Sequence, residues 1–476
     1  MMSQTKDIYA AIKKAKAAAA IFAQLSQEHV DKIVYEVCKA AFDNRVMLAK
    51  LAVEETQLGK FEDKVIKNVV ASQFIYEDIK NMKTVGIISE DEKSGITEIA
   101  QPIGPIFAIT PVTNPTSTVI FKILIALKSR NPIIIRSHTR ALKCSGKTAE
   151  ICYEAALKAD APEDCVQWLH RTAREETHAL MSHEDIALIL ATGGGSLVRA
   201  AYSSGTPAIG VGAGNVPAYI EKSADVPFAV KQIFTSKTFD NGTVCASEQA
   251  IVVEKPVADE VKKELKSGGA YFLSSEEIKK VEDFAYDKER GVMTADIIGQ
   301  LPEVIAEKSG FDIPKGTSLL VAPLEGVGDD YPLSSEILAP VIAYYEAEDF
   351  DGAVNICIDL NFYGGTGHTA SIFSNDDEKI KTFAELMDAG RIVVNTPSSQ
   401  GGVGGLYNTL HTSFTLGCGT RGNNSTTDNI TATHLLNIQR IARRRVNERF
   451  AGFDVNKYFD ESLGFDTLEK EFNLNF

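Results

Sequence analysis

The sequence lacks both a surplus of positive charge and any long apolar run. Its 476 residues include 49 lysines and arginines against 64 aspartates and glutamates, a net charge of −15. Nucleic-acid binding needs an excess of basic side chains on some face, so this balance argues against a nucleic-acid partner. A membrane-spanning helix needs about 18 or more consecutive apolar residues, which no stretch provides. The apolar run at 17–23 is too short for a signal peptide, and we expect a cytoplasmic protein.

Cysteine is scarce, and its spacing excludes two common uses. The chain has only seven cysteines, an odd number, and no two of them stand at CxxC spacing. This pattern argues against a disulfide framework and against a zinc site, so we expect free thiols and no metal. A free cysteine is usually a small buried hydrophobic residue, and core packing is therefore the alternative role for each of them.

Hydrophobic periodicity predicts the fold class. Apolar residues at three- and four-residue spacing predict helices from about residue 5 to 82. Short apolar runs then alternate with amphipathic segments, which is typical of βαβ units and parallel sheets. The predicted strands of the first series are 96–104, 106–110, 132–136, 165–170 and 186–192. Those of the second series are 250–254, 318–323, 341–347, 369–374 and 391–396. We therefore predict an α/β protein with two Rossmann-like lobes.

One cysteine stands at the junction of the two predicted lobes. Cys245 follows an aspartate-asparagine-glycine turn in FDNGTVCASEQ (239–249), and its small neighbours leave the sulfur accessible. Ligands generally bind in clefts between lobes, so this cysteine is a candidate nucleophile. Glycines between a strand and a helix in IALILATGGGSLVRAA (186–201) could present helix N–H groups to a phosphate. That segment is not GxGxxG, and alone it is a weak nucleotide signal.

Seven motifs together resemble one family. In this order along the chain, they are similar to the aldehyde dehydrogenase superfamily. More closely, they resemble its CoA-acylating branch and the aldehyde dehydrogenase half of bifunctional aldehyde-alcohol dehydrogenases. The motifs are TNPTS (113–117), ATGGGSLV (191–198), GVGAGNVPAYI (210–220), FDNGTVCASEQ (239–249), SSEILAPV (334–341), GGTGHTA (364–370) and TLGCGTRGNNS (415–425). The resemblance covers about residues 5 to 445, nearly the whole chain.

The resemblance implies a domain organisation. It implies the aldehyde dehydrogenase fold, with two Rossmann-like parallel-sheet lobes, an oligomerisation β-hairpin and a C-terminal arm. The expected domains are a dinucleotide-binding domain at 1–240, with the hairpin near 85–103, and a catalytic cysteine domain at 241–425. The segment 426–476 is expected to be a C-terminal oligomerisation segment and tail. A homodimer or larger homo-oligomer is implied.

The resemblance also implies catalytic roles. Cys245 matches the nucleophile, and its addition to an aldehyde gives a hemithioacetal that can expel hydride. Asn114 matches the side chain that forms the oxyanion hole with the Cys245 backbone N–H. His368 matches an acid or base, and a histidine pKa near neutrality would suit deprotonation of Cys245 or of CoA. The alternatives are an Asn-Pro turn for Asn114 and a polar cap on a glycine-rich turn for His368.

The main departure from the family pattern is Gly210. Hydrolytic members carry a glutamate here that activates water against the thioacyl enzyme. Without that base the thioacyl intermediate should survive until another thiol, CoA, attacks it. The resemblance thus implies a small aldehyde as substrate, NAD or NADP as cofactor and CoA as co-substrate.

Cofactor contacts are expected along several motifs. The expected residues are Thr110, Pro111, Arg136, His138, Thr192, Gly193, Gly194, Val211, Gly212 and Glu336. Glu336 matches a glutamate that holds the nicotinamide ribose, and its alternative is a solvated helix-start carboxylate. Arg136 could bind the 2′-phosphate of NADP, or could simply face solvent.

The substrate pocket is expected to include His411, Thr412 and Arg421. Relatives commonly carry an aromatic residue at the position of Arg421, and a cation there would favour an anionic aldehyde such as sulfoacetaldehyde or succinate semialdehyde. Alternatively, Arg421 faces solvent or pairs with an acidic neighbour, and the substrate is acetaldehyde. Two other function classes also stay open: a non-acylating or acyl-phosphate reductase on the same fold, and a non-catalytic oligomeric subunit.

Overall fold

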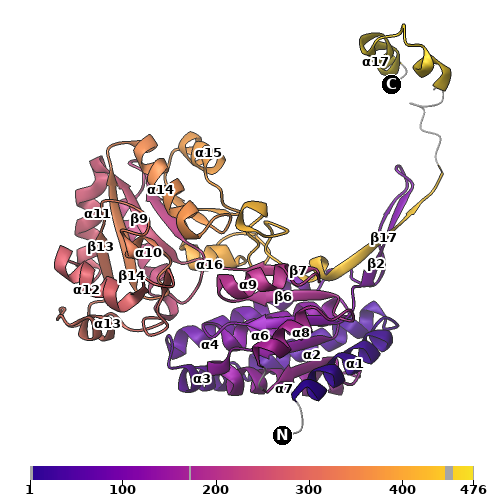
Figure 1. Ribbon diagram of the computed structural model, residues 1–476, viewed down its shortest axis with the longest axis horizontal. Helices are drawn as coiled ribbons and strands as arrows, with labels where there is room; N and C mark the ends of the chain where they lie inside the picture. Colours follow the sequence, from indigo (N-terminus) through magenta and orange to yellow (C-terminus); the bar gives the residue numbers. More distant parts are fainter. Residues whose placement is uncertain (1–3, 171–172, 445–453, 475–476) are drawn as a thin grey trace.

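The computed structural model describes residues 4–170, 173–444 and 454–474. Figure 1 shows two α/β lobes side by side and a narrow sheet that projects from one of them. The predicted α/β class with two parallel-sheet, Rossmann-like lobes is confirmed. Within these described ranges, no helix is long and apolar enough to cross a membrane.

The first lobe contains a five-stranded parallel sheet with the order β5-β4-β3-β6-β7. Its strands are β3 (Ile106–Thr110), β4 (Ile133–Ser137), β5 (Val166–Leu169), β6 (Leu188–Thr192) and β7 (Ala208–Val211). The chain runs outward from β3 to β5 and then returns to the other side of β3. The order therefore reverses between β3 and β6. In open α/β sheets, ligands bind outside the carboxyl ends of the strands at this point.

Helices cover both faces of this sheet. In β3, Ile106 and Ala108 belong to one core cluster, while Phe107 and Ile109 belong to another. Side chains alternate between faces along a strand, and burial of both faces explains why this strand is continuously apolar. The first core contains α2 (Gln27–Asp43), α6 (Pro115–Lys128) and α7 (Leu142–Lys158); the second contains α1 (Gln4–Phe22), α8 (Arg174–Met181) and α9 (Gly195–Tyr202).

The helical region predicted at 5–82 is made of five α-helices and one π-helical segment. Besides α1 and α2, these are α3 (Arg45–Thr56), α4 (Phe61–Val69), η1 (Val70–Phe74) and α5 (Ile75–Ile79). A π-helical stretch inside a longer helix often marks a functional site. In this chain, η1 directly follows α4, whose Lys64 and Lys67 contact Asp240 in the turn before Cys245.

The second lobe contains a seven-stranded parallel sheet with the order β10-β13-β14-β9-β8-β15-β16. Its strands are β8 (Val216–Ile220), β9 (Glu248–Glu254), β10 (Ala270–Phe272), β13 (Leu319–Pro323), β14 (Val341–Ala347), β15 (Ala370–Phe373) and β16 (Ile392–Val394). The helices packed around it are α10 (Val226–Lys237), α11 (Lys255–Ser267), α12 (Ser275–Ala285), α13 (Pro302–Ser309), α14 (Phe350–Gly364) and α15 (Asp377–Leu386). Strand β9 is buried along its whole length, at the centre of the sheet.

The chain enters the second lobe earlier than the sequence suggests. Strand β8 pairs with β9 on one side and with β15 on the other, so it belongs to the larger sheet. The polypeptide therefore passes between the sheets at residues 212–215, before the boundary expected at residue 240. The physical reason is that β8 is buried on both faces, which only an interior position in a sheet provides. The loop 212–215 thus connects the two lobes directly.

A three-stranded antiparallel sheet projects from the first lobe (Figure 1). It consists of β1 (Gly86–Asp91), β2 (Ile96–Pro102) and β17 (Leu436–Ala442), in that order. The expected hairpin near 85–103 is therefore present, and the C-terminal strand pairs with it. The segments η8 (Val455–Phe459) and α17 (Phe465–Leu474) lie beyond its tip. A role of this sheet in oligomer formation stays a prediction.

A left-handed glycine fixes the segment that leads from α14 to β15. Gly367 has φ +79°, and a Cβ atom added there would lie 1.7 Å from the carbonyl oxygen of Cys418. Its N–H donates to the Asp388 carbonyl at 2.7 Å, and its own carbonyl accepts from Gly390 at 2.8 Å. Only glycine satisfies both the backbone angle and the close approach. The position of the next residue, His368, depends on this geometry.

We expect Gly367→Ala to lower the free energy of unfolding by about 3 kcal/mol or more, because the methyl group meets backbone that cannot move away. Gly364→Ala is a matched control in the same motif, since its added Cβ would lie 3.9 Å from the Asn215 side chain, an ordinary contact. That variant should change the free energy by less than about 0.5 kcal/mol. Equal stabilities of the two variants in denaturant titrations would contradict this account.

Candidate active site

Cys245 lies on the turn between the 3-10 helix η3 (Phe239–Gly242) and strand β9. The Ser247 N–H donates to the Val244 carbonyl at 2.9 Å and closes the turn around the cysteine. All seven cysteines are free thiols, and Cys245 is the one that is not fully buried. In the preceding turn, Asp240 and Asn241 have positive φ angles of 49° and 53°. Aspartate and asparagine adopt this conformation more readily than most residues, which explains the turn sequence.

The loop between the two sheets passes directly beside Cys245. A Cβ atom on Gly214 would lie 2.3 Å from the Cys245 carbonyl oxygen and 3.1 Å from two atoms of the His368 ring. Gly214 therefore fits between the cysteine turn and the histidine only because it has no side chain. The structure thus brings Cys245 and His368, which are far apart in the sequence, to opposite sides of one glycine.

His368 is completely buried and held by hydrogen bonds at three atoms. Its backbone N–H donates to the Gly365 carbonyl at 2.9 Å, and its backbone carbonyl accepts from Arg391 Nη1 at 2.8 Å. In the ring, Nδ1 lies 2.9 Å from Thr369 Oγ1. Within the described residues its Nε2 has no partner. The imidazole therefore keeps one nitrogen available to a bound group.

The near-neutral pKa expected for His368 is wrong for this geometry. Burial, together with the smaller effect of the positive charge of Arg391, lowers the pKa of His368 to about 3. The imidazole is therefore neutral at physiological pH. A neutral imidazole can exchange a proton with a thiol that contacts it. It carries no positive charge that would stabilise a thiolate.

Burial also keeps the Cys245 thiol protonated. It raises the pKa of Cys245 to about 12, and the nearby Glu336 carboxylate acts in the same direction, whereas Arg391 opposes both. The reactive thiolate therefore has to form with the help of a proton acceptor in the site. Arg391 is the nearby cation that favours it.

Glu336 reaches the same loop from the second lobe. Its Oε1 accepts a hydrogen bond from the Gly214 N–H at 2.9 Å. Burial raises the pKa of Glu336 to about 7, against the opposing effects of this hydrogen bond and of Lys237. It is therefore not the solvated carboxylate that a helix start would suggest. Its position beside Cys245 and Gly214 is compatible with a ribose contact in the cleft.

Asn114 stands at the N-terminus of α6, directly before Pro115 in the first turn of the helix. Its side-chain Oδ1 accepts a hydrogen bond from Lys67 Nζ at 2.6 Å. Its Nδ2 makes only a long contact of 3.3 Å with Thr113 Oγ1. Since Lys67 occupies the carbonyl end of the amide, the N–H end remains available as a donor.

The predicted dinucleotide contacts follow one edge of the first sheet. Thr110 ends β3, Thr192 ends β6 and Val211 ends β7, and the strand register places them side by side. The hydroxyls of Thr110 and Thr192 are buried and have no partner in the part of the chain that the structure describes. Pro111, Gly193 and Gly212 immediately follow these three strand ends.

This edge has the features that a dinucleotide requires. Gly194 caps the N-terminus of α9, and an added Cβ atom at Gly194, Gly195 or Gly212 would meet nothing within 4 Å. The space above the glycines is open, and helix N–H groups can face a pyrophosphate. Together with two unpaired hydroxyls at the point where strand order reverses, these residues fit NAD or NADP.

Arg136 and His138 lie at the next position along this edge, at the end of β4. Arg136 is half-buried, and burial lowers the pKa of its guanidinium. His138 Nδ1 accepts from the Arg140 N–H at 3.2 Å, so the histidine caps the following turn. Burial lowers the pKa of His138, and the two flanking arginines lower it further. A cationic group thus lies at the end of β4, beside the end of β3 on this edge.

The three expected substrate residues are not brought together as an anion pocket. Arg421 Nη1 is 2.9 Å from Asp388 Oδ2, and 69% of the arginine side chain is exposed. His411 Nδ1 lies 2.9 Å from Asp78 Oδ1 and is also exposed. Thr412 is buried and would contact any side chain at Gly405. The acidic-neighbour alternative considered for Arg421 therefore describes its contact in the structure.

Apolar side chains surround the cysteine turn instead. Val244 and Ala246, on either side of Cys245, belong to one small core cluster. Its other members are Val70, Phe74, Phe239, Val403, Phe414 and Leu416. Two of them, Val70 and Phe74, come from the π-helical segment η1. The surroundings of the nucleophile on this side are therefore uncharged and partly aromatic.

Gly210 has no room for the side chain that would make the site hydrolytic. A Cβ atom there would lie 2.7 Å from Val198 Cγ1 and 3.2 Å from Tyr202 Cε2. The Tyr202 hydroxyl accepts from the Gly210 N–H at 2.8 Å, and Asn424 Nδ2 donates to the Gly210 carbonyl. The space that the glutamate of hydrolytic members would need at this position is therefore filled by the neighbouring side chains.

Four buried charged residues near the site were missed by the sequence analysis. Arg391 supports the His368 carbonyl and also donates to the Gly417 and Thr427 carbonyls. The other three, Lys64, Lys67 and Asp240, form an ion-pair group below the cysteine turn. Lysines in EDKVIKN (62–68) are typical of a solvated helix face, so the sequence gives no signal for their burial.

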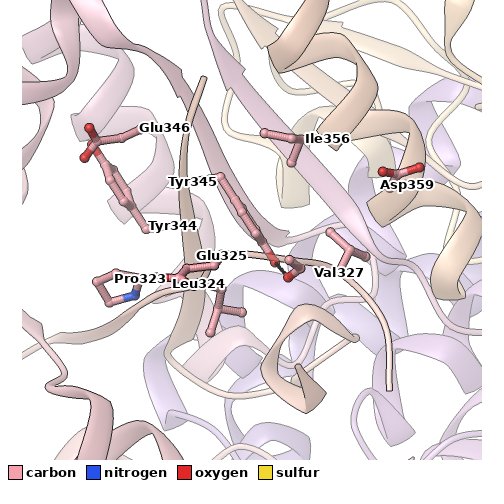
Figure 2. Close-up of a pocket in the computed structure, with 10 residues that line it drawn as sticks. Pro323, Leu324, Glu325, Val327, Tyr344, Tyr345, Glu346, Ile356 and Asp359 are labelled. Carbon is pink, nitrogen blue, oxygen red and sulfur yellow. Dashed lines mark hydrogen bonds between the residues drawn. The ribbon is translucent and has the colours of Figure 1, made fainter. Parts of the chain in front are cut away.

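A separate pocket lies at the carboxyl ends of strands β13 and β14 of the second sheet. Figure 2 shows its aromatic and acidic lining, and its volume is about 410 Å³. The lining residues include Pro323, Leu324, Glu325, Tyr344, Tyr345, Glu346 and Asp359. Asp359 comes from α14, and the others lie at or just after the carboxyl ends of β13 and β14, whereas Cys245 precedes the amino end of the parallel strand β9. This pocket is therefore distinct from the cysteine site. Across the described ranges, no cluster of metal-ligating side chains is present either.

Comparison with known proteins places this geometry in a family. The model of the aldehyde dehydrogenase family matches residues 1–270 and 322–409. The bifunctional aldehyde-alcohol dehydrogenase AdhE of Escherichia coli K12 is 44% identical over 96% of this chain and 52% of its own length. Succinate-semialdehyde dehydrogenase (acetylating) of Clostridium kluyveri is 38% identical over 92% of this chain and 96% of its own length.

A solved structure gives the same result. The acetylating aldehyde dehydrogenase from Geobacillus thermoglucosidasius has 45% identity and a TM-score of 0.91, covering 93% of this chain and 97% of its own. The chain spans about half the length of the first curated relatives it matches. The expected resemblance to the acylating branch and to the aldehyde dehydrogenase portion of bifunctional enzymes is confirmed. The chain belongs to the aldehyde dehydrogenase family.

Proposed function

We propose that this protein is a CoA-acylating aldehyde dehydrogenase. It would convert an aldehyde, CoA and NAD(P)⁺ into an acyl-CoA and NAD(P)H. The observation that carries the proposal is the pairing of an accessible Cys245 with a filled Gly210 position. A nucleophile is present. The position from which a base would direct water to the acyl intermediate is a glycine, and the neighbouring side chains leave no room there for a carboxylate. The word "acetylating" in the names of two relatives supports the same reaction.

The first half of the reaction uses Cys245 and Asn114. The Cys245 thiol gives its proton to His368 Nε2, its sulfur adds to the carbonyl carbon of the aldehyde, and the carbonyl oxygen becomes an alkoxide. His368 then releases this proton to solvent. The Asn114 amide N–H and the Cys245 backbone N–H donate to that oxygen. When bound, the nicotinamide supplies a hydride acceptor, and the alkoxide collapses to a thioester on Cys245. The residues that fit its ribose and phosphates are Glu336 and the ends of β3 and β6.

The second half transfers the acyl group to CoA. The CoA thiol loses its proton and attacks the thioester carbon, and the Cys245 thiolate leaves. His368 Nε2, buried and unpartnered within the described residues, is the group we assign to exchange this proton. Because its basicity is low, the ring would hold the proton only briefly and would be neutral again between turnovers. Cys245 returns to the thiol form that its raised pKa favours.

The surroundings of Cys245 support a short, uncharged aldehyde. Val244, Phe74 and Phe414 supply apolar surface, which favours an alkyl group over a sulfonate or carboxylate. Arg421 could compensate such a charge only by giving up its ion pair with Asp388. We therefore propose acetaldehyde or a close homologue as the substrate. The dinucleotide is NAD or NADP, and the Arg136 guanidinium is the group that a 2′-phosphate would meet.

The nucleophile assignment predicts the behaviour of Cys245→Ser. NAD(P)H formation should fall by at least about 10³-fold, because a serine hydroxyl needs a strong base that neutral His368 does not provide. Dinucleotide binding, measured by fluorescence titration, should stay within about twofold, since Cys245 is not among the expected dinucleotide contacts and most of these lie on the first lobe. Turnover within tenfold of the parent would show that Cys245 is not the nucleophile. An acyl-phosphate reductase would instead require inorganic phosphate for turnover.

The raised pKa of Cys245 predicts a steep pH dependence of its alkylation. With a pKa of about 12, the thiolate fraction at pH 7 is on the order of 10⁻⁵ and increases tenfold per pH unit. Without dinucleotide, iodoacetamide labelling of the Cys245 peptide should therefore accelerate about tenfold per unit from pH 7 to 10. Peptide mass spectrometry gives the rate for this cysteine alone. A plateau below pH 8 would mean that the thiolate is already formed in the free protein.

The apolar surroundings predict the substrate preference. We expect kcat/KM for acetaldehyde to exceed that for succinate semialdehyde and sulfoacetaldehyde by at least about tenfold, because a charged tail would lose its solvation there. Arg421→Ala should change all three values by less than about threefold. Leu410→Ala, on the exposed end of the neighbouring loop, controls for general loop effects. A selective loss on the two anionic aldehydes in Arg421→Ala would restore the anion-pocket hypothesis.

A further inference from the structure

A buried ion-pair group connects the two halves of the candidate site. Lys64 and Lys67, on helix α4, are 2% and 4% exposed, and Asp240 is completely buried. Both ammonium groups contact the same carboxylate oxygen, Asp240 Oδ2. Asp240 begins the left-handed part of the turn that leads to Cys245. The group therefore joins a helix of the first lobe to the nucleophile turn.

Lys67 is the member that also contacts Asn114. Its Nζ donates to Asn114 Oδ1 at 2.6 Å, to Thr243 Oγ1 at 3.0 Å and to Asp240 Oδ2. An ammonium group has three N–H donors, so every one of them is used. The three acceptors come from the start of α6 and from the cysteine turn. Lys67 thus sets the distance between the amide of Asn114 and the residues just before Cys245.

The contact fixes which end of the Asn114 amide faces the cleft. Rotation of the amide by half a turn would place its NH₂ group against the Lys67 ammonium, donor against donor. The charged donor therefore holds Oδ1 inward, and Nδ2 is left to face a substrate oxygen. A cation at Oδ1 also withdraws electron density from the amide, which makes its N–H a stronger donor.

Lys67 carries its charge at neutral pH. Burial is the main cause that lowers its pKa to about 8, Asp240 partly opposes it, and Lys64 acts in the same direction as burial. Most of the molecules therefore carry the ammonium at neutral pH. The titratable groups around it are Lys64, Asp240 and Asp63, whose carboxylate accepts from the Asp240 N–H at 2.7 Å. Lys60 completes the surroundings, since its N–H donates to Asp240 Oδ1 at 2.7 Å.

We propose that Lys67 is a positioning residue that orients the Asn114 amide and ties it to the turn of Cys245. This inference rests on the proposed function, in which Asn114 donates to the alkoxide. Lys67 does not touch the aldehyde; it acts through Asn114. Lys64 carries the same charge on the same helix, but it bonds Asp240 and the Thr113 carbonyl rather than the Asn114 side chain. It is therefore the natural control.

The test is a set of single variants and one double variant of the full chain. They are Lys67→Met, Lys67→Gln, Lys64→Met, Asn114→Ala and Lys67→Met/Asn114→Ala. For each, kcat and KM are measured with aldehyde, NAD⁺ and CoA, together with the pre-steady-state NADH burst that reports acylation of Cys245. Thermal unfolding shows whether each variant is folded. Gln serves where Met does not fold, because it retains a polar group against Asp240.

The proposal predicts a specific pattern. Asn114→Ala should lower the burst rate by about 10²-fold or more, the usual effect of losing an oxyanion donor. Lys67→Met should lower kcat and the burst rate at least tenfold and leave KM for NAD⁺ within twofold. Lys64→Met should stay within about threefold of the parent burst rate. The double variant should be no slower than Asn114→Ala alone, since Lys67 has nothing left to orient.

Each contrary outcome has a distinct meaning. If Asn114→Ala keeps the parent burst rate, the oxyanion role in the proposed function fails. If Asn114→Ala is slow but Lys67→Met is not, the proposed function stands and the positioning role is overturned. Multiplied losses in the double variant, or equal losses in Lys64→Met and Lys67→Met, would also overturn it, because they indicate a general structural effect of the buried charge.

Discussion

The close approach of three segments at Gly214 is the constraint on which the site depends. The Cys245 turn, the His368 ring and the Glu336 carboxylate all contact this one residue, and no side chain fits there. Gly214 belongs to the loop that leaves the smaller sheet and enters the larger one. The cysteine turn, the histidine and the carboxylate all belong to the second lobe, and this loop residue lies among them. A side chain at Gly214 would therefore change the distances among Cys245, His368 and Glu336.

Burial gives these groups unusual charge states. It raises the pKa of Cys245 and Glu336 and lowers that of His368, so the resting site carries a thiol, a half-protonated carboxyl and a neutral imidazole. The cations Arg391 and Lys67 are buried, and each bonds protein acceptors. Such a site holds little charge until the substrate oxygen becomes an alkoxide. Preorganised donors are then most effective, because water is excluded and they need no reorganisation.

The sequence predicts the fold well where burial imposes a regular pattern. Segments such as 106–110 and 250–254 are apolar on both faces, and they are interior strands. Strand β10 does not show this apolar pattern, because it has only three residues and is only partly buried. Strand β8 lies inside a motif whose glycines draw attention to a loop. The sequence pattern alone therefore does not reveal that β8 pairs with strands of the larger sheet.

For the site, sequence motifs identify groups that touch the reaction but not the groups that support them. Cys245, Asn114 and Glu336 stand in recognisable motifs. In the structure, Gly214 lies against both the Cys245 turn and Glu336, and Lys67 joins Asn114 to Thr243 in that turn. Lys67 and Arg391 look like surface residues, because nothing in a local pattern reveals a buried partner distant in sequence. For Arg421, the motif identifies the residue but not the contact of its side chain. Its type suggested an anion pocket, but the direction of its side chain depends on Asp388, which only the folded chain places beside it.

The central claim is that the acyl group on Cys245 passes to CoA and not to water. The direct measurement is a single-turnover experiment with aldehyde and NAD⁺ in the absence of CoA, followed by intact-protein and peptide mass spectrometry. The account predicts one NADH per active site, an acyl mass on the Cys245 peptide that persists, and rapid release of acyl-CoA when CoA is added. Continuous NADH production with free carboxylate before CoA is added would contradict it.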